Sequence, residues 1–174
     1  MDPAAGECEF INSIPANEKW AIDQNKDLIN LDLVNVKTIV GNSLTIELPN
    51  DYFDAIFISN FLEHLPSPDK VSFLLEKMYY SLKNKGRIAI MGPNFKYAYK
   101  DYFDFADHYL PLTEQSIAEH LYGTGFNILK IYPKFLPLSF KSNLPPNKIL
   151  VKIYLSVHFL WSFFGKQFLI LAAK

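Results

Sequence analysis

The chain has 174 residues, 49% of them hydrophobic and 20% charged, which fits one folded domain and excludes a disordered chain. Its formal net charge is −1 and it has no basic block, so nothing predicts binding to nucleic acid. The single cysteine, Cys8, excludes a disulfide within the chain and fits a cytoplasmic location, and the first ten residues lack the positive segment of a secretory signal.

Four short apolar runs in the first half are each closed by small or polar residues, which is typical of buried strands in a parallel sheet. They cover residues 20–22, 38–40, 55–58 and 87–91. A helix is expected between the last two, because Ser67 suits the N-cap, Pro68 suits the first helical position, and apolar residues follow on one face up to Leu82. Strand, helix and strand make a right-handed crossover, which predicts an α/β sandwich.

The second half predicts one more helix and two strands around a long excursion. The helix begins after Thr113 and ends at Gly123 or Gly125, and the strands cover 126–132 and 167–173. The excursion, residues 133–166, is longer than about 15 residues, a length that usually carries function or a lid. We therefore expect an insertion or lid between the last two strands of a single domain that covers residues 1–174.

Apolar residues recur at near-helical spacing within this excursion, in an apolar stretch over residues 149–164. Lys152 and His158 interrupt the stretch, and it is shorter than the roughly 20 apolar residues that a transmembrane helix needs. Lys148, Lys152 and Lys166 flank it, as expected of an interfacial helix in peripheral contact with a membrane, or of a lid over an apolar acceptor. The alternative is a helix that packs on the sheet.

Residues at the carboxyl ends of the predicted strands are candidates for ligand binding in an open α/β sheet. Residues 2–10 contain small residues at Ala4, Gly6 and Cys8, which let the backbone turn tightly and pass close to a ligand. Asp23 follows the first predicted strand, 21 positions after Asp2, where an acid can accept hydrogen bonds from ribose hydroxyls. An ordinary N-terminal turn and a solvated strand-end acid are the alternatives.

Segments along essentially the whole chain resemble the class I (Rossmann-like) S-adenosylmethionine-dependent methyltransferases. Those segments are residues 2–10, 18–23, 41–43, 48–65, 82–88, and 125–126 with 167–170. The resemblance implies a three-layer α/β sandwich, with a mostly parallel sheet and an antiparallel C-terminal hairpin, and S-adenosylmethionine as cofactor. The residues that it places at the cofactor are Asp2, Ala4, Gly6, Asp23, Asn42, Ser43 and Asn60.

The sequence also departs from this family at several positions. Ala4 and Cys8 stand where glycine is commoner, and Asn42 replaces an aspartate, although its side-chain carbonyl can still accept from an adenine amino group. Family members have a helix and a full strand ahead of the loop, so we expect both to be missing and the chain to be N-terminally truncated. A catalytically inactive methyltransferase fold, serving as a binding or scaffold protein or arising from a pseudogene, is therefore the alternative function.

Three further segments narrow the resemblance to methyltransferases encoded beside glycosyltransferases in bacterial surface-polysaccharide clusters. They are residues 92–95, 101–108 and 135–137. This resemblance implies a small-molecule acceptor, such as a sugar or a lipid-linked saccharide. A nicotinamide-dependent dehydrogenase of the same fold is disfavoured, because it would need a G-x-G-x-x-G loop that residues 4–9 do not provide.

His108 is the candidate catalytic base, because it follows an aromatic and acidic cluster and its ordinary pKa is near neutral. Asp104 or Asp107 is expected to orient it, and the alternative is a structural histidine that caps a loop. Glu63 is a weaker candidate for lining the methionine end of the cofactor site. No histidine and carboxylate cluster at ligand spacing occurs along the sequence, so no metal is expected.

Overall fold

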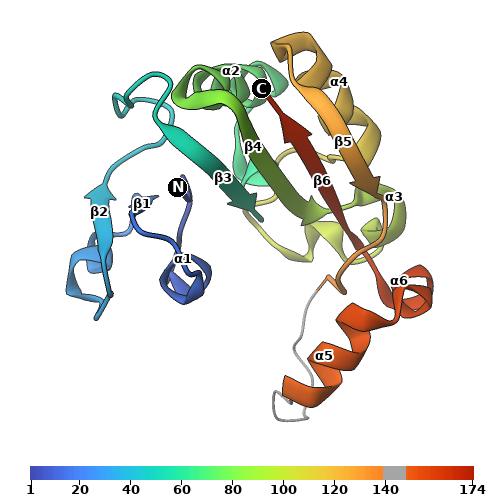
Figure 1. Ribbon diagram of the computed structural model, residues 1–174. Helices are drawn as coiled ribbons and strands as arrows, with labels where there is room; N and C mark the ends of the chain where they lie inside the picture. The colour runs from blue at the N-terminus through green and yellow to red at the C-terminus, as the bar shows by residue number, and fades with distance from the viewer. Residues whose placement is uncertain (139–147) are drawn as a thin grey trace.

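The computed structural model describes residues 1–138 and 148–174, and its main sheet has the strand order β3-β4-β6-β5 (Figure 1). These strands are β3 (Phe53–Ser59), β4 (Leu82–Pro93), β6 (Gln167–Ala173) and β5 (Asn127–Tyr132). β3 and β4 are parallel, whereas β6 runs antiparallel to both of its neighbours. The expected Rossmann-like α/β fold, with an antiparallel C-terminal hairpin, is confirmed.

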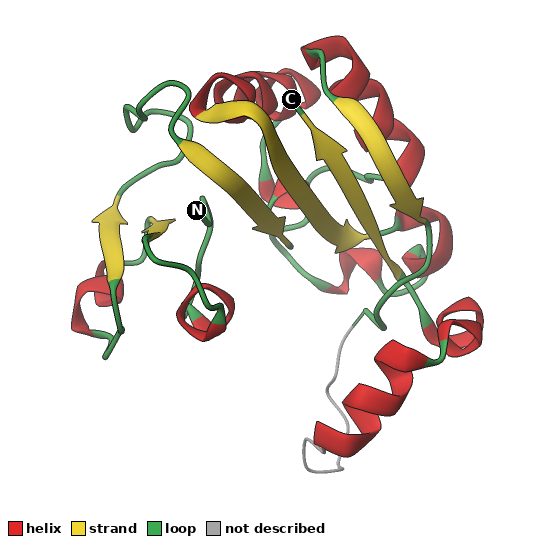
Figure 2. Ribbon diagram, in the orientation of Figure 1, coloured by secondary structure: helices red, strands yellow, loops and turns green. Residues whose placement is uncertain are grey.

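A second, two-stranded parallel sheet lies beside the main sheet (Figure 2). It consists of β1 (Lys19–Asp23) and β2 (Val36–Val40), next to α1 (Glu9–Ser13) and the short helix η1 (Lys26–Asn30). The backbone of Met1 makes two hydrogen bonds of 2.9 and 3.0 Å with β3, and the backbone of Asp2 makes two of 2.8 and 3.0 Å with β1. An aromatic-lined cavity of about 420 Å³ separates the rest of β1 from β3.

Helices α2 (Pro68–Ser81) and α4 (Glu114–Thr124) pack side by side against the main sheet (Figure 1). The apolar face predicted for α2 is buried, in one core with the inward side chains of β3, β4 and β6. Ser67 precedes α2 as expected but makes no side-chain capping bond. Thr113 forms a capping box with Ser116 at the start of α4, and Gly125, at φ 98°, ends that helix in the left-handed conformation that glycine allows.

The apolar stretch over 149–164 forms two helices, α5 (Lys148–Ser156) and α6 (His158–Phe164), which project from the body of the molecule (Figure 1). Trp161 is buried against Tyr132 at the end of β5 and attaches α6 there, whereas most of the other apolar side chains of the two helices are exposed and do not pack on the sheet. Pro145 and Pro146, within the excursion, lie outside the described residues. No helix within residues 1–138 and 148–174 is long and apolar enough to cross a membrane.

Short helical segments follow the carboxyl ends of β3 and β4. They are η2 (Leu62–His64) after β3, and α3 (Phe95–Ala98) with η3 (Tyr102–Asp104) after β4. Because ligands bind beyond this edge in open α/β sheets, these segments and the loop before α1 define the region in which a site is expected.

Candidate functional site

The loop between Asp2 and α1 curls over the carboxyl end of β1. Its backbone is held by a 3.0 Å hydrogen bond from the N–H of Ala5 to the carbonyl of Ile22, at the end of the strand. Gly6 and Cys8 take positive φ angles of 51° and 62°, which produce the tight turn. A cavity of about 410 Å³ lies at this loop, within the range of small-molecule sites. Its lining includes Asp2, Ala4, Gly6, Phe10, Ser59 and Asn60.

The carboxylate of Asp23 is fixed against this loop. Its Oδ2 accepts a 2.8 Å hydrogen bond from the backbone N–H of Gly6, and its Oδ1 accepts one of 2.9 Å from the N–H of Asn25. The side chain is only half-buried, so its remaining lone pairs face solvent at the end of β1. The structure thus brings the two strongest elements of the sequence prediction, the glycine loop and the strand-end acid, into direct contact.

Asp2 is buried beneath the same loop, 4% exposed. Its Oδ1 accepts a 3.1 Å hydrogen bond from the backbone N–H of Ala4. Burial raises the pKa of the Asp2 carboxyl to about 6, and the hydrogen bond from Ala4 lowers this pKa by a smaller amount. Asp2 therefore supports the loop from below and carries a carboxyl that is costly to ionise.

Asn42 and Ser43 follow β2 and stabilise their own surroundings. The side-chain Oδ1 of Asn42 accepts a 2.9 Å hydrogen bond from the N–H of Leu44, which closes a local turn. The Ser43 hydroxyl is buried and donates to the carbonyl of Pro3, so it fastens the loop ahead of Gly6. Neither side chain lines the cavity beside the loop.

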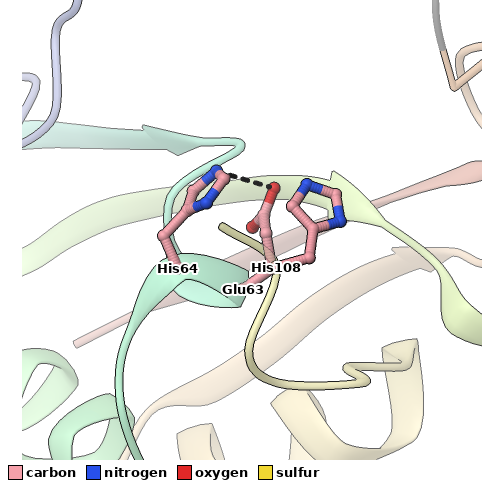
Figure 3. A group of neighbouring side chains, drawn as sticks. All are labelled: Glu63, His64 and His108. Carbon is pink, nitrogen blue, oxygen red and sulfur yellow. Dashed lines mark ion pairs between the residues drawn. The ribbon is translucent and has the colours of Figure 1, made fainter. Parts of the chain in front are cut away.

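A second group of polar side chains, Glu63, His64 and His108, meets beyond the ends of β3 and β4 (Figure 3). One oxygen of Glu63 and one ring nitrogen of each histidine lie within 4.8 Å of one another. We call these three residues the Glu63 cluster. Glu63 and His108 are separate candidates in the sequence, and no local signal indicates that residues 63–64 meet residue 108.

Backbone hydrogen bonds fix the relative position of the two halves of this cluster. The Glu63 carbonyl accepts from the N–H groups of Tyr109 and Leu110, at 2.9 and 3.1 Å. Gly92 on β4 lies directly beside Glu63, because a β-carbon there would be 3.3 Å from Cζ of Phe168 and 3.4 Å from Oε2 of Glu63. The loop that carries His108 is therefore attached directly to the residue that carries the acid.

Burial perturbs both kinds of titratable group in the cluster. It raises the pKa of the Glu63 carboxyl to about 7. Burial, followed by the neighbouring His64 ring, lowers the pKa of His108 below its ordinary value. Asp107 lies beside His64, with its Oδ2 3.3 Å from His64 Nδ1. Asp104, the first residue expected to orient His108, instead lines a separate groove.

That groove, of about 350 Å³, separates the loop after β4 from the base of α6. Its lining consists of Asp101, Asp104, Phe105, Pro137, Leu138, Phe164 and Lys166. The Phe105 ring also stacks on the His108 ring, with centroids 4.8 Å apart and planes 19° from parallel. One aromatic side chain therefore connects the groove with the Glu63 cluster.

A family model described as a methyltransferase domain matches residues 2–90, which is half of the chain. The chain belongs to this methyltransferase family. It is an S-adenosylmethionine-dependent methyltransferase of class I, and S-adenosylmethionine is its cofactor. The matched residues contain the loop, Asp23 and the first two members of the Glu63 cluster.

Solved structures of S-adenosylmethionine-dependent methyltransferases share the fold of this methyltransferase. The structure from Archaeoglobus fulgidus is 24% identical with a TM-score of 0.66, and the match covers 89% of this chain and 75% of that one. The structure from Mesorhizobium loti is 13% identical with a TM-score of 0.68, covering 99% and 89%. The structure from Methanosarcina mazei is 18% identical with a TM-score of 0.61, covering 89% and 81%. No curated protein matches the methyltransferase significantly.

Proposed function

We propose that this methyltransferase modifies a hydroxyl group of a saccharide that is carried on a lipid. The observation that carries the proposal is the groove lined by Asp101, Asp104 and Phe105, which runs from the ring that stacks on His108 to the base of the projecting helices α5 and α6. A saccharide in this groove would have its reacting hydroxyl near the Glu63 cluster and its lipid near the exposed apolar helices.

The residues around the loop fit the cofactor. S-adenosylmethionine supplies an electrophilic methyl group on a sulfonium. In our proposal the half-buried carboxylate of Asp23 accepts hydrogen bonds from the ribose hydroxyls, and the backbone at Ala4 and Gly6 approaches the amino-acid end. Asn60 lines the same cavity from the end of β3. Asp2 and Ser43 hold the loop in place, and Asn42 shapes the turn on the adenine side.

The composition of the groove supports a saccharide acceptor. The carboxylates of Asp101 and Asp104 accept hydrogen bonds from hydroxyl groups, and Lys166, which pairs with Asp101, can donate them. The faces of Phe105 and Phe164 offer apolar surfaces to the C–H face of a sugar ring. Asp104 thus takes an acceptor-binding role in place of the orienting role expected from the sequence.

His108 is positioned to receive the proton of the acceptor hydroxyl. Its lowered pKa keeps the ring neutral near pH 7, which is the form that accepts a proton. The Phe105 ring lines the groove and stacks on one face of the imidazole, which it shields. Apart from this proton transfer, the protein positions donor and acceptor and excludes water.

The exposed side chains of α5 and α6 support contact with a lipid surface. They include Val151, Ile153, Leu155, Phe159, Phe163 and Phe164. A cluster of exposed apolar side chains on short helices, with Lys152 among them, is typical of interfacial segments. The buried free thiol of Cys8 is compatible with a cytoplasmic membrane face.

The proposal is tested by transfer of labelled methyl from S-adenosylmethionine to a polyprenyl-linked oligosaccharide in liposomes, and to the same oligosaccharide without lipid. We expect label in both saccharides and more in the lipid-linked one. Asp104→Asn should raise the KM for the acceptor while S-adenosylhomocysteine binds as before. Cofactor binding without label in either saccharide would overturn the proposed acceptor, and loss of all cofactor binding would favour the inactive alternative.

A further inference from the structure

We propose that Glu63, His64 and His108 bind one divalent transition-metal ion of the Zn²⁺ type. The carboxylate of Glu63 lies beside both imidazole rings, and the two rings contact each other with their centroids 5.0 Å apart (Figure 3). Two imidazoles and one carboxylate are a ligand set that suits such ions and leaves further coordination positions open.

The cluster contains buried polar atoms that the protein leaves unsatisfied. Glu63 is 2% exposed, and among the described residues its Oε1 has no hydrogen-bond partner. The Nε2 atom of His64 lies 3.8 Å from this oxygen, too far for a hydrogen bond. Because a buried carboxylate is costly unless it is paired, a divalent cation beside Glu63 would supply the missing compensation.

His64 is oriented in the way that metal-binding histidines are. Its Nδ1 lies 2.8 Å from the backbone carbonyl of Asp107, and a carbonyl can only accept, so Nδ1 carries the proton. Its Nε2 therefore presents a lone pair toward the Glu63 carboxylate. Metal-binding histidines usually donate such a hydrogen bond from the ring nitrogen that does not bind the metal. This bond fixes the tautomer and the orientation of the ring.

The geometry requires only a small closure around an ion. Three atoms that all lie within 4.8 Å of one another are at most about 2.8 Å from the point midway between them, whereas Zn²⁺ ligands lie at about 2.1 Å. Each atom therefore needs to move by at most about 0.7 Å. The backbone bonds from Tyr109 and Leu110 to Glu63 hold the cluster together during this closure.

The choice of ion follows from the ligand atoms. Mg²⁺ and Ca²⁺ prefer oxygen ligands, and Mg²⁺ gives up its water reluctantly, so two imidazole nitrogens disfavour both. Zn²⁺ with two histidines and one glutamate keeps a position for water or substrate. His64 is 28% exposed, so that open position is reached from its side of the cluster.

Metal binding changes the role of His108 but does not depend on the acceptor proposed above. With an ion bound, His108 is a ligand and no longer takes the acceptor proton. The ion lowers the pKa of a hydroxyl at its open position, and the proton leaves to water. No metal was expected from the sequence, because only the linear spacing of histidines and carboxylates was available there. In that spacing residue 108 is remote from residues 63 and 64.

The test is a calorimetric titration of ZnCl2 and, separately, MgCl2 into the full chain after treatment with a chelator. We expect one Zn²⁺ per chain and no binding of Mg²⁺ at the same concentration. Glu63→Gln and His108→Ala should each weaken Zn²⁺ binding at least tenfold. His120→Ala is the matched control, because this partly buried histidine is on α4 and hydrogen-bonds Ser72, and it should leave the affinity unchanged.

A second measurement protects the test against variants that fail to fold. Co²⁺ should give visible d–d absorption with the wild type, and His64→Ala, at the exposed side of the cluster, should lose it while keeping the far-ultraviolet circular dichroism of the parent. Zn²⁺ should also raise the melting temperature of the wild type, because a ligand of the native state stabilises it. No saturable Zn²⁺ binding by the wild type, or binding that survives both Glu63→Gln and His108→Ala, would overturn the proposal.

Discussion

The backbone N–H of Gly6 donates a 2.8 Å hydrogen bond to Oδ2 of Asp23. This bond attaches the loop ahead of α1 to the end of β1. The Asp23 carboxylate therefore closes the loop and keeps further lone pairs available to a ligand. Loss of the carboxylate should lower the affinity for the cofactor both directly and through the loop.

Asp23→Ala should weaken S-adenosylhomocysteine binding by about 1.5–3 kcal/mol, the range for losing hydrogen bonds to a charged group. Isothermal titration calorimetry measures this change. Asp27→Ala is the control, because it removes the same charge from η1, just beyond the end of β1, and should leave the affinity unchanged. Equal affinities for wild type and Asp23→Ala would remove Asp23 from the cofactor site.

Asp2→Asn should stabilise the protein above pH 6 and have little effect at pH 3. The folded-state pKa of about 6 lies above the ordinary value of 3.8, so the folded chain binds the proton more tightly than the unfolded chain. Ionisation therefore costs stability progressively between pH 3.8 and 6, and fully above that window. We expect a gain of about 1–3 kcal/mol at pH 8.

Urea unfolding of wild type and Asp2→Asn at pH 8 and at pH 3 measures this difference. Asp51→Asn, at an exposed carboxylate paired with Lys174, serves as control and should show no comparable gain at pH 8. A loss of stability at pH 8 in Asp2→Asn would mean that ionised Asp2 is compensated in the folded protein.

Phe159→Ser combined with Phe163→Ser should abolish binding to liposomes without lowering the melting temperature. These rings contact each other on α6, and they are 69% and 67% exposed. Vesicle co-sedimentation should show a loss of about a hundredfold or more, since insertion of each of the two exposed rings contributes more than about 1.4 kcal/mol, which is tenfold in affinity. Wild-type protein that does not bind vesicles would end the membrane proposal.

Trp161→Ser on the same helix should behave in the opposite way. Trp161 is buried against Tyr132 and Phe135, and its Nε1 donates a 2.9 Å hydrogen bond to the carbonyl of Tyr154. Truncation should cost about 3–5 kcal/mol, as for other buried aromatic side chains, and differential scanning calorimetry should show a lower melting temperature. An unchanged melting temperature would mean that Trp161 does not anchor α6.

Thr113→Ala should destabilise the protein by about 1 kcal/mol. Thr113 Oγ1 accepts from the N–H of Ser116 at 3.2 Å, and the Ser116 hydroxyl accepts from the N–H of Thr113 at 2.9 Å, so the substitution breaks a reciprocal cap. Thr124→Ala at the other end of α4 should change stability by less than about 0.5 kcal/mol. Equal denaturation midpoints for Thr113→Ala and wild type would show that the cap contributes nothing.

Elements with local signals were predicted from the sequence. The start of α4 after Thr113 was predicted, and its end at Gly125 is one of the two glycines predicted to end it, because both signals depend on neighbouring residues alone. β4 begins at Leu82, earlier than the predicted run from residue 87, because Leu82 pairs with Phe53 on β3. The helix predicted over 149–164 is broken at Val157, and the apolar pattern alone did not show which face, if any, is covered.

The candidate site divides in the same way. The glycine loop and Asp23 are close in sequence, with α1 and β1 between them. Their spacing was therefore enough to indicate that they lie together. The Glu63 cluster depends on the long connection after β4 returning to η2, where the backbone of Tyr109 pairs with Glu63. No property of the residues near His108 indicates that this connection returns to η2. The sequence therefore did not show that Asp107, and not Asp104, would lie beside His64.

The attachment of β1 and β2 to the rest of the molecule has a consequence for local unfolding. Among the described residues, neither strand hydrogen-bonds directly to β3, and the backbone bonds of Met1 and Asp2 bridge the two sheets beside a cavity. Amide hydrogens of β1 should therefore exchange through an opening of lower free energy than those of β4, as separate cooperative units do. A cofactor held between Asp23 on one unit and Asn60 on the other would couple their openings, so S-adenosylhomocysteine should slow exchange most in β1.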